Sequence, residues 1–249
     1  MSEHANARPV ALITGAARRV GAVIARRLHA AGYDVAVHCR HSRAERDALI
    51  SELEQTRAES TLALDADLAD SAQLAGLIAA TVDRFGRLDA LINNASSFHP
   101  TPIGSVTLDQ WEDLMATNAR APFFLAQAAA PHLAARRGAI VNLTDIYADR
   151  PLPNHSVYCM AKAALATMTR SLAVDLGPEV RVNAIAPGAV LWPESGKESA
   201  ERERLIARTP LKRVGAPDDV AGAVLWLLRD ASFVTGEIVR VDGGRSLAM

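Results

Sequence analysis

Short apolar runs alternate along the chain with longer stretches in which apolar residues recur at helical spacing. The short runs are bounded by turn residues and are almost continuously apolar, as expected for parallel strands that are covered on both faces. They lie at residues 10–14, 35–38, 61–64, 90–93, 139–143, 180–185 and 238–241. Repeated strand and helix units of this kind predict an α/β fold with a doubly wound, parallel, seven-stranded sheet and helices on both faces.

Three connecting segments carry more specific signals. Residues 107–110 read Thr-Leu-Asp-Gln, a capping-box pattern that predicts a helix running to about residue 117. Pro131 is expected to begin or interrupt the helix that follows. Proline, serine and glycine cluster between residues 187 and 197, which predicts an irregular loop that moves over a ligand.

Composition and charge limit the classes of partner. The 249 residues are 49% hydrophobic and 22% charged with a net charge of -1, which predicts one globular domain over residues 1–249 and no nucleic-acid partner. No apolar run reaches the ~20 residues that cross a bilayer, so we expect a cytoplasmic protein without a membrane contact. The 2 cysteines and 7 histidines lack metal-ligand spacing, so no catalytic metal is expected.

A glycine-containing turn follows the first predicted strand. Residues 14–21 read Thr-Gly-Ala-Ala-Arg-Arg-Val-Gly and open the first helix, where free backbone N–H groups can receive a pyrophosphate. The alternative is a tight turn without a ligand. Because the surrounding strand-helix-strand unit is also present, we favour a Rossmann-like dinucleotide site.

The end of the second strand indicates which dinucleotide binds. Residues 38–42 read His-Cys-Arg-His-Ser, without the carboxylate that would hold the ribose 2'-hydroxyl of NAD. Arg40 and Ser42 can instead bind the 2'-phosphate of NADP. In the alternative interpretation, Arg40 and Arg43 form only a solvated helix start. Asp67 and Asn94 lie at the carboxyl ends of the next strands, beside the same crevice.

Tyr158 and Lys162 supply a candidate proton carrier. Their i, i+4 spacing places them on one helix face, where the ammonium is expected to lower the pKa of the tyrosine toward the working range. Taken alone, such a pair is usually only part of a helix surface.

Taken together, these motifs make the chain resemble the short-chain dehydrogenase/reductase family over nearly its whole length. The resemblance implies Tyr158 as the general acid and Lys162 as a ligand of the nicotinamide ribose that also tunes the tyrosine. It further implies Asn118 as the support of a proton-relay water, and a homotetramer. The matching landmarks, in order, are residues 14–21, 93–95, Asn118, Tyr158, Lys162, Pro187 and Gly188.

Three departures from the usual family pattern bear on the substrate. Arg19 replaces the second glycine of the phosphate loop, Ser96 replaces the glycine after Asn-Asn-Ala, and Asp145 replaces the catalytic serine. In these features the chain is similar to the pteridine reductases. That similarity implies a pterin between Phe98 and the nicotinamide, with Ser96 and Arg19 at its polar edge and Asp145 joining Tyr158 in proton delivery. The alternative for Phe98 is a core aromatic.

The predicted activity is therefore NADPH-dependent reduction of pterins, dihydropterins and dihydrofolate. Two alternatives remain: a carbonyl reductase acting, for example, on a 3-oxoacyl thioester, and a non-catalytic NADP-binding regulatory protein. Asp145 argues against the first, and the intact Asn118, Tyr158 and Lys162 argue against the second. The predicted cofactor-binding residues are Gly15, Arg18, Arg19, Val20, Gly21, Arg40, His41, Ser42, Asp67, Leu68, Asn94, Ala95, Ser96, Tyr158, Lys162, Pro187 and Gly188.

Overall fold

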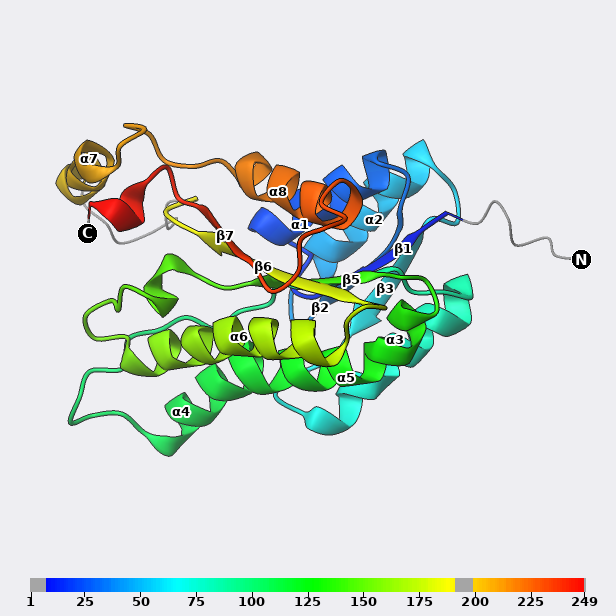
Figure 1. Cartoon of the computed structure of the whole chain (residues 1–249), viewed down its shortest axis with the longest axis horizontal. Helices are drawn as coiled ribbons and strands as arrows, with labels where there is room; N and C mark the ends of the chain where they lie inside the picture. The colour runs from blue at the N-terminus through cyan, green and yellow to red at the C-terminus, as the bar shows by residue number, and fades with distance from the viewer. Residues whose placement is uncertain (1–7, 191–198, 249) are drawn as a thin grey trace, which may run out of the picture.

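Seven parallel strands form one sheet in the order β3-β2-β1-β4-β5-β6-β7 (Figure 1). The structure is a computed structural model that describes residues 8–190 and 199–248. The predicted α/β fold is confirmed, and each predicted strand is present with ends that differ by two residues at most. The strands are β1 Val10–Ile13, β2 Asp34–Cys39, β3 Thr61–Asp65, β4 Ala90–Asn93, β5 Ala139–Leu143, β6 Arg181–Pro187 and β7 Ile238–Val241.

Helices cover both faces of this sheet. In Figure 1, α1, α2 and α8 lie above the sheet, whereas α3, α5 and α6 lie below it. The helices are α1 Arg19–Ala30, α2 Arg43–Thr56, α3 Ser71–Phe85, α4 Leu108–Met115, α5 Ala121–Ala134, α6 Ser156–Asp175, α7 Ser199–Arg208 and α8 Pro217–Arg229. Three short turns complete the described elements: the π-helical turn η1 Ala116–Arg120 and the 3-10 turns η2 Ile146–Ala148 and η3 Arg245–Leu247.

The core explains why the strands are nearly continuous in apolar character. Ile13 packs with Leu28 on one face of the sheet, while the preceding Leu12 packs with Leu91 and Leu125 on the other. Successive strand residues point to opposite faces, so both must be apolar when both faces are covered. Burying each of these side chains stabilises the fold by roughly 1.5–3 kcal/mol.

The connection from α4 to α5 differs in part from expectation. The predicted capping box is confirmed, since Thr107 Oγ1 accepts from Gln110 N at 3.2 Å and Gln110 Oε1 accepts from Thr107 N at 3.0 Å. The helix does not stop near residue 117 but continues through η1 into α5. Pro131 lies inside α5 and neither begins nor interrupts it. Pro131 lies close to the helix end and removes one backbone hydrogen bond. The free energy gained by burying Leu133 in the core opposes this cost.

The strand order reverses at β1, which pairs with both β2 and β4. In a sheet of this kind, a crevice opens outside the carboxyl ends of the strands at the reversal. Of the predicted loop over residues 187–197, residues 191–197 lie outside the described part of the chain, and α7 follows from Ser199. Within the described residues, no helix has the length and apolar character needed to cross a membrane.

Candidate active site

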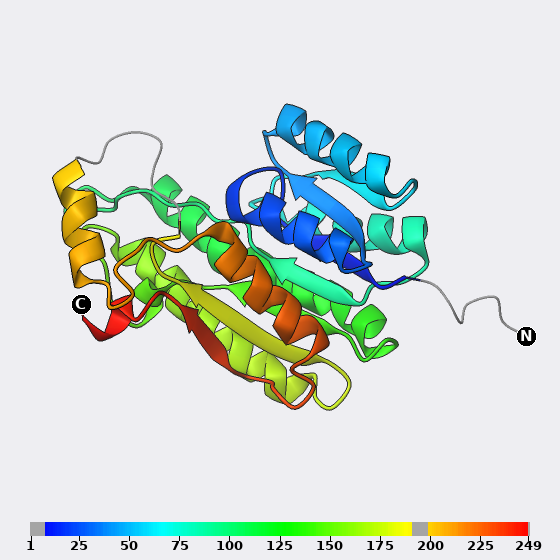
Figure 2. The same ribbon diagram turned by 90° about the horizontal axis from the view of Figure 1, so that it is seen from above.

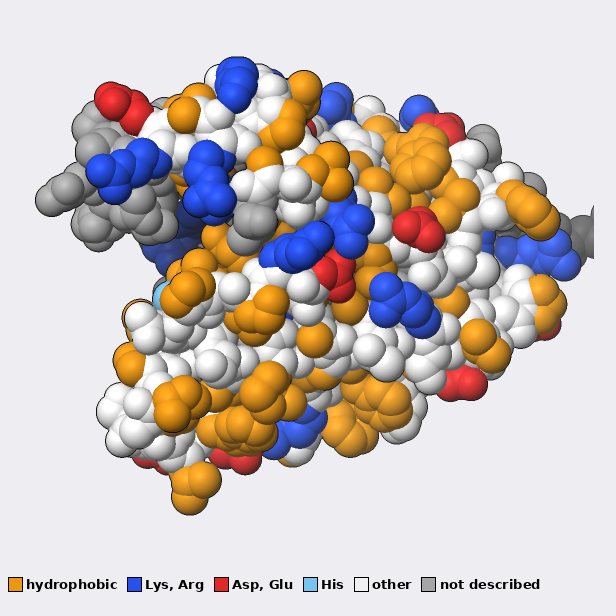
Figure 3. All heavy atoms as spheres, turned by 60° about the vertical axis from the view of Figure 1, so that its left-hand side comes forward, with side chains coloured by type: hydrophobic (Ala, Val, Ile, Leu, Met, Phe, Trp, Pro, Cys, Tyr) orange, Lys and Arg blue, Asp and Glu red, His pale blue; other side chains and the backbone are white. Residues whose placement is uncertain are grey.

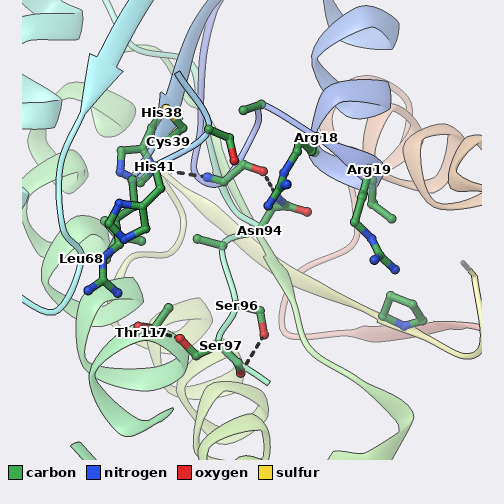
Figure 4. Close-up of a pocket in the computed structure, with 18 of the residues that line it drawn as sticks. Arg18, Arg19, His38, Cys39, His41, Leu68, Asn94, Ser96, Ser97 and Thr117 are labelled. Atoms are coloured by element: carbon green, nitrogen blue, oxygen red, sulfur yellow. Dashed lines mark hydrogen bonds between the residues drawn. The ribbon is translucent and has the colours of Figure 1, made fainter. Parts of the chain in front are cut away.

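A cleft of about 560 Å³ lies at the carboxyl ends of the central strands. In Figure 4, Arg18 and Arg19 lie on one side of it, His41 and Leu68 lie on the other, and Ser96 lies at its lower end. Every predicted cofactor-binding residue except Lys162 lines this cleft. Sequence reasoning missed the further lining residues Ala17, His38, Cys39, Ser97, Thr117, Ala189 and Val190.

The N-terminus of α1 faces this cleft and suits an anion. No side chain caps it at Arg18, and its first turn contains no acidic residue. Asn94 Nδ2 holds the preceding loop by donating to the carbonyl oxygens of Thr14 at 2.8 Å and Gly15 at 3.0 Å. An uncapped helix N-terminus presents free N–H groups and a partial positive charge. The loop therefore fits the pyrophosphate of a dinucleotide.

Close packing fixes the residue types in this loop. A Cβ on Gly21 would lie 2.3 Å from Gly15 O and 2.6 Å from Asn94 Nδ2, so only glycine fits there. Arg19 has a φ of +53°, in the left-handed region that favours glycine. Holding an arginine in this conformation costs about 1 kcal/mol, so Arg19 is a strained residue in a loop that lines the cleft.

His38 supports the same loop from β2. Its Nδ1 accepts from Gly15 N at 3.2 Å, and its Nε2 lies 3.2 Å from Ala66 O. These partners require the neutral ring with hydrogen on Nε2, and burial lowers the pKa of His38 accordingly. The signal for this role in the sequence is a histidine inside an otherwise apolar strand.

The segment after β2 carries the groups predicted for a 2'-phosphate. Arg40 Nη2 lies 3.0 Å from Asp67 Oδ2, and its Nη1 lies 3.9 Å from Asp113 Oδ1. Ser42 is the N-terminal cap residue of α2, and its hydroxyl makes no capping hydrogen bond. The predicted ligand Asp67 thus lines the cleft but also holds Arg40, whose side chain remains 45% exposed. Arg40 and the α2 N-terminus together suit a phosphate.

Three charged or ionisable side chains meet where β5 ends and α6 begins. Tyr158 Oη donates to Asp145 Oδ2 at 2.7 Å, and Tyr147 N donates to Asp145 Oδ1 at 2.9 Å. Lys162 Nζ donates to Leu143 O at 2.8 Å and lies 5.8 Å from the centroid of the Tyr158 ring. The predicted i, i+4 pair therefore shares one face of α6, with Asp145 opposite the tyrosine hydroxyl.

The pKa values in this group are set mainly by burial. Burial raises the pKa of Asp145, although its hydrogen bond from Tyr147 N opposes the change. Burial, reinforced by Asp145, raises the pKa of Tyr158 well above 10. Burial also lowers the pKa of Lys162 to about 8. The expectation that Lys162 lowers the pKa of Tyr158 is wrong, because desolvation and the neighbouring carboxyl outweigh the ammonium.

Asn118 organises the serine segment after β4. Ser96 Oγ donates to Asn118 Oδ1 at 2.7 Å, and Asn118 Nδ2 donates to Ser97 O and to Leu114 O, each at 2.9 Å. Asn118 lies in the π-helical turn η1, a rare backbone form that is frequent at functional sites. Its role as the support of a relay water stays a prediction.

Phe98 lies beside the tyrosine rather than in the core. Its side chain is 55% exposed, so the core-aromatic interpretation is wrong. The ring stacks on His155 at a centroid distance of 4.7 Å and meets Tyr158 edge to face at 4.8 Å. His155 and Tyr158 thus cover part of the ring, and the exposed remainder is the surface available to a ligand. Phe98 and Asp145 lie next to Tyr158 but do not line the cleft itself.

No metal centre emerges from the described residues, among which no group of three or more His, Cys, Asp or Glu side chains could hold an ion. Both cysteines are free and buried. Burial raises the pKa of the Cys159 thiol, so its position next to Tyr158 fits packing rather than nucleophilic chemistry.

A dinucleotide-type cleft beside a tyrosine and lysine pair is typical of nicotinamide-dependent oxidoreductases. A family model described as enoyl-(acyl carrier protein) reductase matches residues 15–246. With this match and the relatives below, the chain belongs to the short-chain dehydrogenase/reductase family.

Relatives that are named for different activities match the chain almost equally well. Pteridine reductase 1 of Leishmania tarentolae is 35% identical over 96% of this chain and 96% of its own. An uncharacterized oxidoreductase of Methylorubrum extorquens is 36% identical over 94% of this chain and 96% of its own. A 3-oxoacyl-acyl-carrier-protein reductase of Staphylococcus aureus is 33% identical over the same shares. The similarity therefore establishes the family, and the choice of substrate depends on the site.

Proposed function

We propose that the protein reduces pterins and dihydropterins, and also dihydrofolate, to their tetrahydro forms with NADPH. The hydrogen bond of 2.7 Å between Tyr158 and Asp145 carries this proposal. A buried acid bonded to a tyrosine is suited to protonating a ring nitrogen, whereas carbonyl reduction in this family uses a hydroxyl residue at that position.

Reduction of a ring C=N bond needs a hydride at carbon and a proton at nitrogen. NADPH, when bound, supplies the hydride. Tyr158 Oη donates its proton to the nitrogen and receives the proton of Asp145 in its place. The carboxylate that results is held by Tyr147 N and by the same tyrosine hydroxyl. The raised pKa of Asp145 keeps its carboxyl protonated closer to neutral pH than an exposed aspartate would be.

The groups around this pair suit a flat heterocycle. Phe98, which is 55% exposed, offers aromatic surface for stacking at the side of Tyr158. Ser96 and Arg19 line the cleft and offer hydrogen bonds to the polar edge of a pterin. Arg19 keeps a strained backbone conformation in a loop where glycine would be relaxed, which supports a ligand-binding use for its side chain.

We assign NADPH rather than NADH on the groups after β2. Arg40 and Ser42 would hold the 2'-phosphate, and no carboxylate stands among residues 38–42. Lys162, buried under the tyrosine, would reach the nicotinamide ribose. The α1 N-terminus would hold the pyrophosphate.

We also propose a homotetramer in the cytoplasm. Phe123 and Phe124 on α5 are each 41% exposed, and Met160 and Val174 on α6 are exposed as well. Figure 3 shows hydrophobic side chains gathered on the lower layer, where these helices lie in Figure 1. An apolar helical face of this kind favours contact with another copy.

The decisive experiment is a comparison of NADPH oxidation with dihydrobiopterin, dihydrofolate and acetoacetyl-coenzyme A as substrates. Turnover of either pteridine at least tenfold above a no-substrate control supports the proposal. Turnover of the thioester alone would refute it and leave the family assignment intact.

A 3-oxoacyl thioester reductase is the second candidate, favoured by the Staphylococcus aureus relative. Asp145 counts against it, because carbonyl reduction in this family uses a hydroxyl residue at the position that Asp145 occupies beside Tyr158. The thioester arm of the same assay tests this candidate directly.

A further inference from the structure

A second cavity of about 600 Å³ is lined by Tyr147, two residues beyond Asp145 in the chain. Its walls come from the segment between η2 and α6, from α7, and from the C-terminal turn η3. Figures 1 and 2 both show α7 beside the C-terminal segment, so these distant parts of the chain meet in space. Four arginines line this cavity: Arg150, Arg204, Arg208 and Arg245.

Of these four arginines, Arg208 donates from Nη2 to Ala248 O at 3.2 Å. Within the described part of the chain, no hydrogen bond or ion pair joins Arg150, Arg204 or Arg245 to a carboxylate. Arg245 Nε is buried without a hydrogen-bond partner. Figure 3 shows Lys and Arg side chains around and inside a recess on this side of the molecule. Positive side chains in one cavity repel one another, and a buried N–H without a partner is unfavourable. An anionic ligand would relieve the repulsion and accept the hydrogen bond.

The remaining wall of the arginine cavity is apolar. Leu152, Pro151 and Leu205 contribute aliphatic surface, and Tyr147 contributes an aromatic ring. A ligand that fits must therefore combine an apolar, flat part with negative charge at its far end.

Two residues connect the arginine cavity to the proton-donating pair. Tyr147 lines the cavity and donates its backbone N–H to Asp145. Arg245 also lines the cavity and is close enough to Asp145 to lower the pKa of that carboxyl against the effect of burial. A substrate whose reacting ring lies at Tyr158 could therefore extend into the arginine cavity.

We propose that the arginine cavity binds the p-aminobenzoyl-glutamate part of dihydrofolate. The benzoyl ring packs on the apolar wall, and Arg150, Arg204 and Arg245 bind the glutamate carboxylates. This inference rests on the proposed pteridine reduction and makes it more specific, because it selects conjugated pterins over unconjugated ones. The pterin ring supplies contacts common to both substrates, and the arginines act on the tail alone.

The test compares dihydrofolate with dihydrobiopterin, which has no carboxylate. The variants are R150Q, R204Q and the double variant, which keep length and polarity but remove charge. R229Q is the matched control, since Arg229 lies on α8 and pairs with Asp230. Arg245 is left intact because it also acts on Asp145. We expect the ratio of kcat/KM for dihydrofolate over dihydrobiopterin to fall about tenfold or more in the double variant and to be unchanged in R229Q.

Each outcome has a distinct meaning. An equal loss with both substrates, or no change with either, would overturn the inference while leaving pteridine reduction in place. A rise in KM for acetoacetyl-coenzyme A alone would overturn it too, because the arginines would then serve the phosphates of a thioester. Calorimetric titration with p-aminobenzoyl-glutamate gives a readout independent of turnover. Binding to the wild type and about tenfold weaker binding to the double variant support the inference even if no pteridine is reduced.

Discussion

The Tyr158 hydroxyl lies 2.7 Å from the Asp145 carboxylate, and burial raises the pKa of both groups. A tyrosine paired with an ammonium alone would become a stronger acid. Here the Asp145 carboxyl makes Tyr158 a weaker acid and carries the second proton that can be transferred. The two groups therefore titrate as a coupled pair. Substitution of Tyr158 should mainly lower turnover, and substitution of Asp145 should also change its pH dependence.

Replacing Tyr158 by phenylalanine should lower kcat for dihydrobiopterin by about 100-fold or more, because the proton donor is lost. NADPH binding should stay within about threefold of the wild type, since the ring and its packing remain. Steady-state kinetics and fluorescence titration with NADPH measure the two effects. Near-normal turnover with tight NADPH binding would show that the tyrosine is not the donor.

Substituting Asp145 by asparagine should change the pH profile. The raised pKa keeps the carboxyl protonated above the ordinary value of 3.8, so wild-type kcat should be highest on the acid side and fall as pH rises through that raised pKa. D145N should have a lower kcat that no longer falls in that range. Measuring kcat across the pH range tests this, and a wild-type kcat that instead rises with pH would contradict it.

Arg40 should determine the cofactor preference. Removing its guanidinium in R40A should reduce the preference for NADPH over NADH by about 10- to 100-fold, as expected for lost charge-assisted hydrogen bonds to a phosphate. R43A is a matched control, because Arg43 pairs with Asp65 and does not line the cleft. The ratio of kcat/KM for the two cofactors is the measurement. Equal preferences in R40A and wild type would refute the 2'-phosphate assignment.

Arg19 offers a test of strain against function. R19G should raise the free energy of unfolding by about 1 kcal/mol by relieving the positive φ, whereas R19A keeps the strain. Both variants should raise KM for dihydrobiopterin, because both lose the side chain at the polar edge of the substrate. Urea denaturation and steady-state kinetics separate the two effects. Equal stability of R19G and R19A would argue against stored strain.

His38 should make stability depend on pH. Its pKa is lowered in the folded protein from the ordinary 6.5, so the unfolded chain takes up a proton first as pH falls. The stability present above about pH 6.5 should be lost progressively below it. In H38N, which can still accept from Gly15 N, this loss should be smaller. Urea denaturation between neutral and mildly acidic pH measures the difference, and parallel curves for both proteins would contradict it.

The sequence was sufficient to predict the sheet and much of the cleft for a physical reason. Strands such as β1 and β5 are buried on both faces, so their apolar runs are unambiguous. Loops at the carboxyl ends of such strands meet at one edge, which is why Gly15, Asn94 and Pro187 could be assigned together. Sequence could not predict that Pro131 lies inside a helix, because the packing of α5 rather than local propensity determines this.

The parts of the site that escaped prediction depend on tertiary contacts. His155 stacks on Phe98 across 57 positions of sequence, a pairing that periodicity does not reveal. The raised pKa of Tyr158 follows from burial rather than from its spacing to Lys162. The arginine cavity combines residues from three separate segments, of which none is unusual in charge by itself.

The π-helical turn at Asn118 lies between the site and the exposed helical face. On its inner side, Asn118 holds Ser96 and Ser97, while Phe123 and Phe124 follow one turn later on the outer surface. A neighbouring subunit pressing on that surface would shift the same stretch of backbone that sets the serine positions. In the proposed homotetramer, subunit association and substrate geometry would be mechanically connected, and turnover per chain should then depend on protein concentration wherever the assembly begins to dissociate.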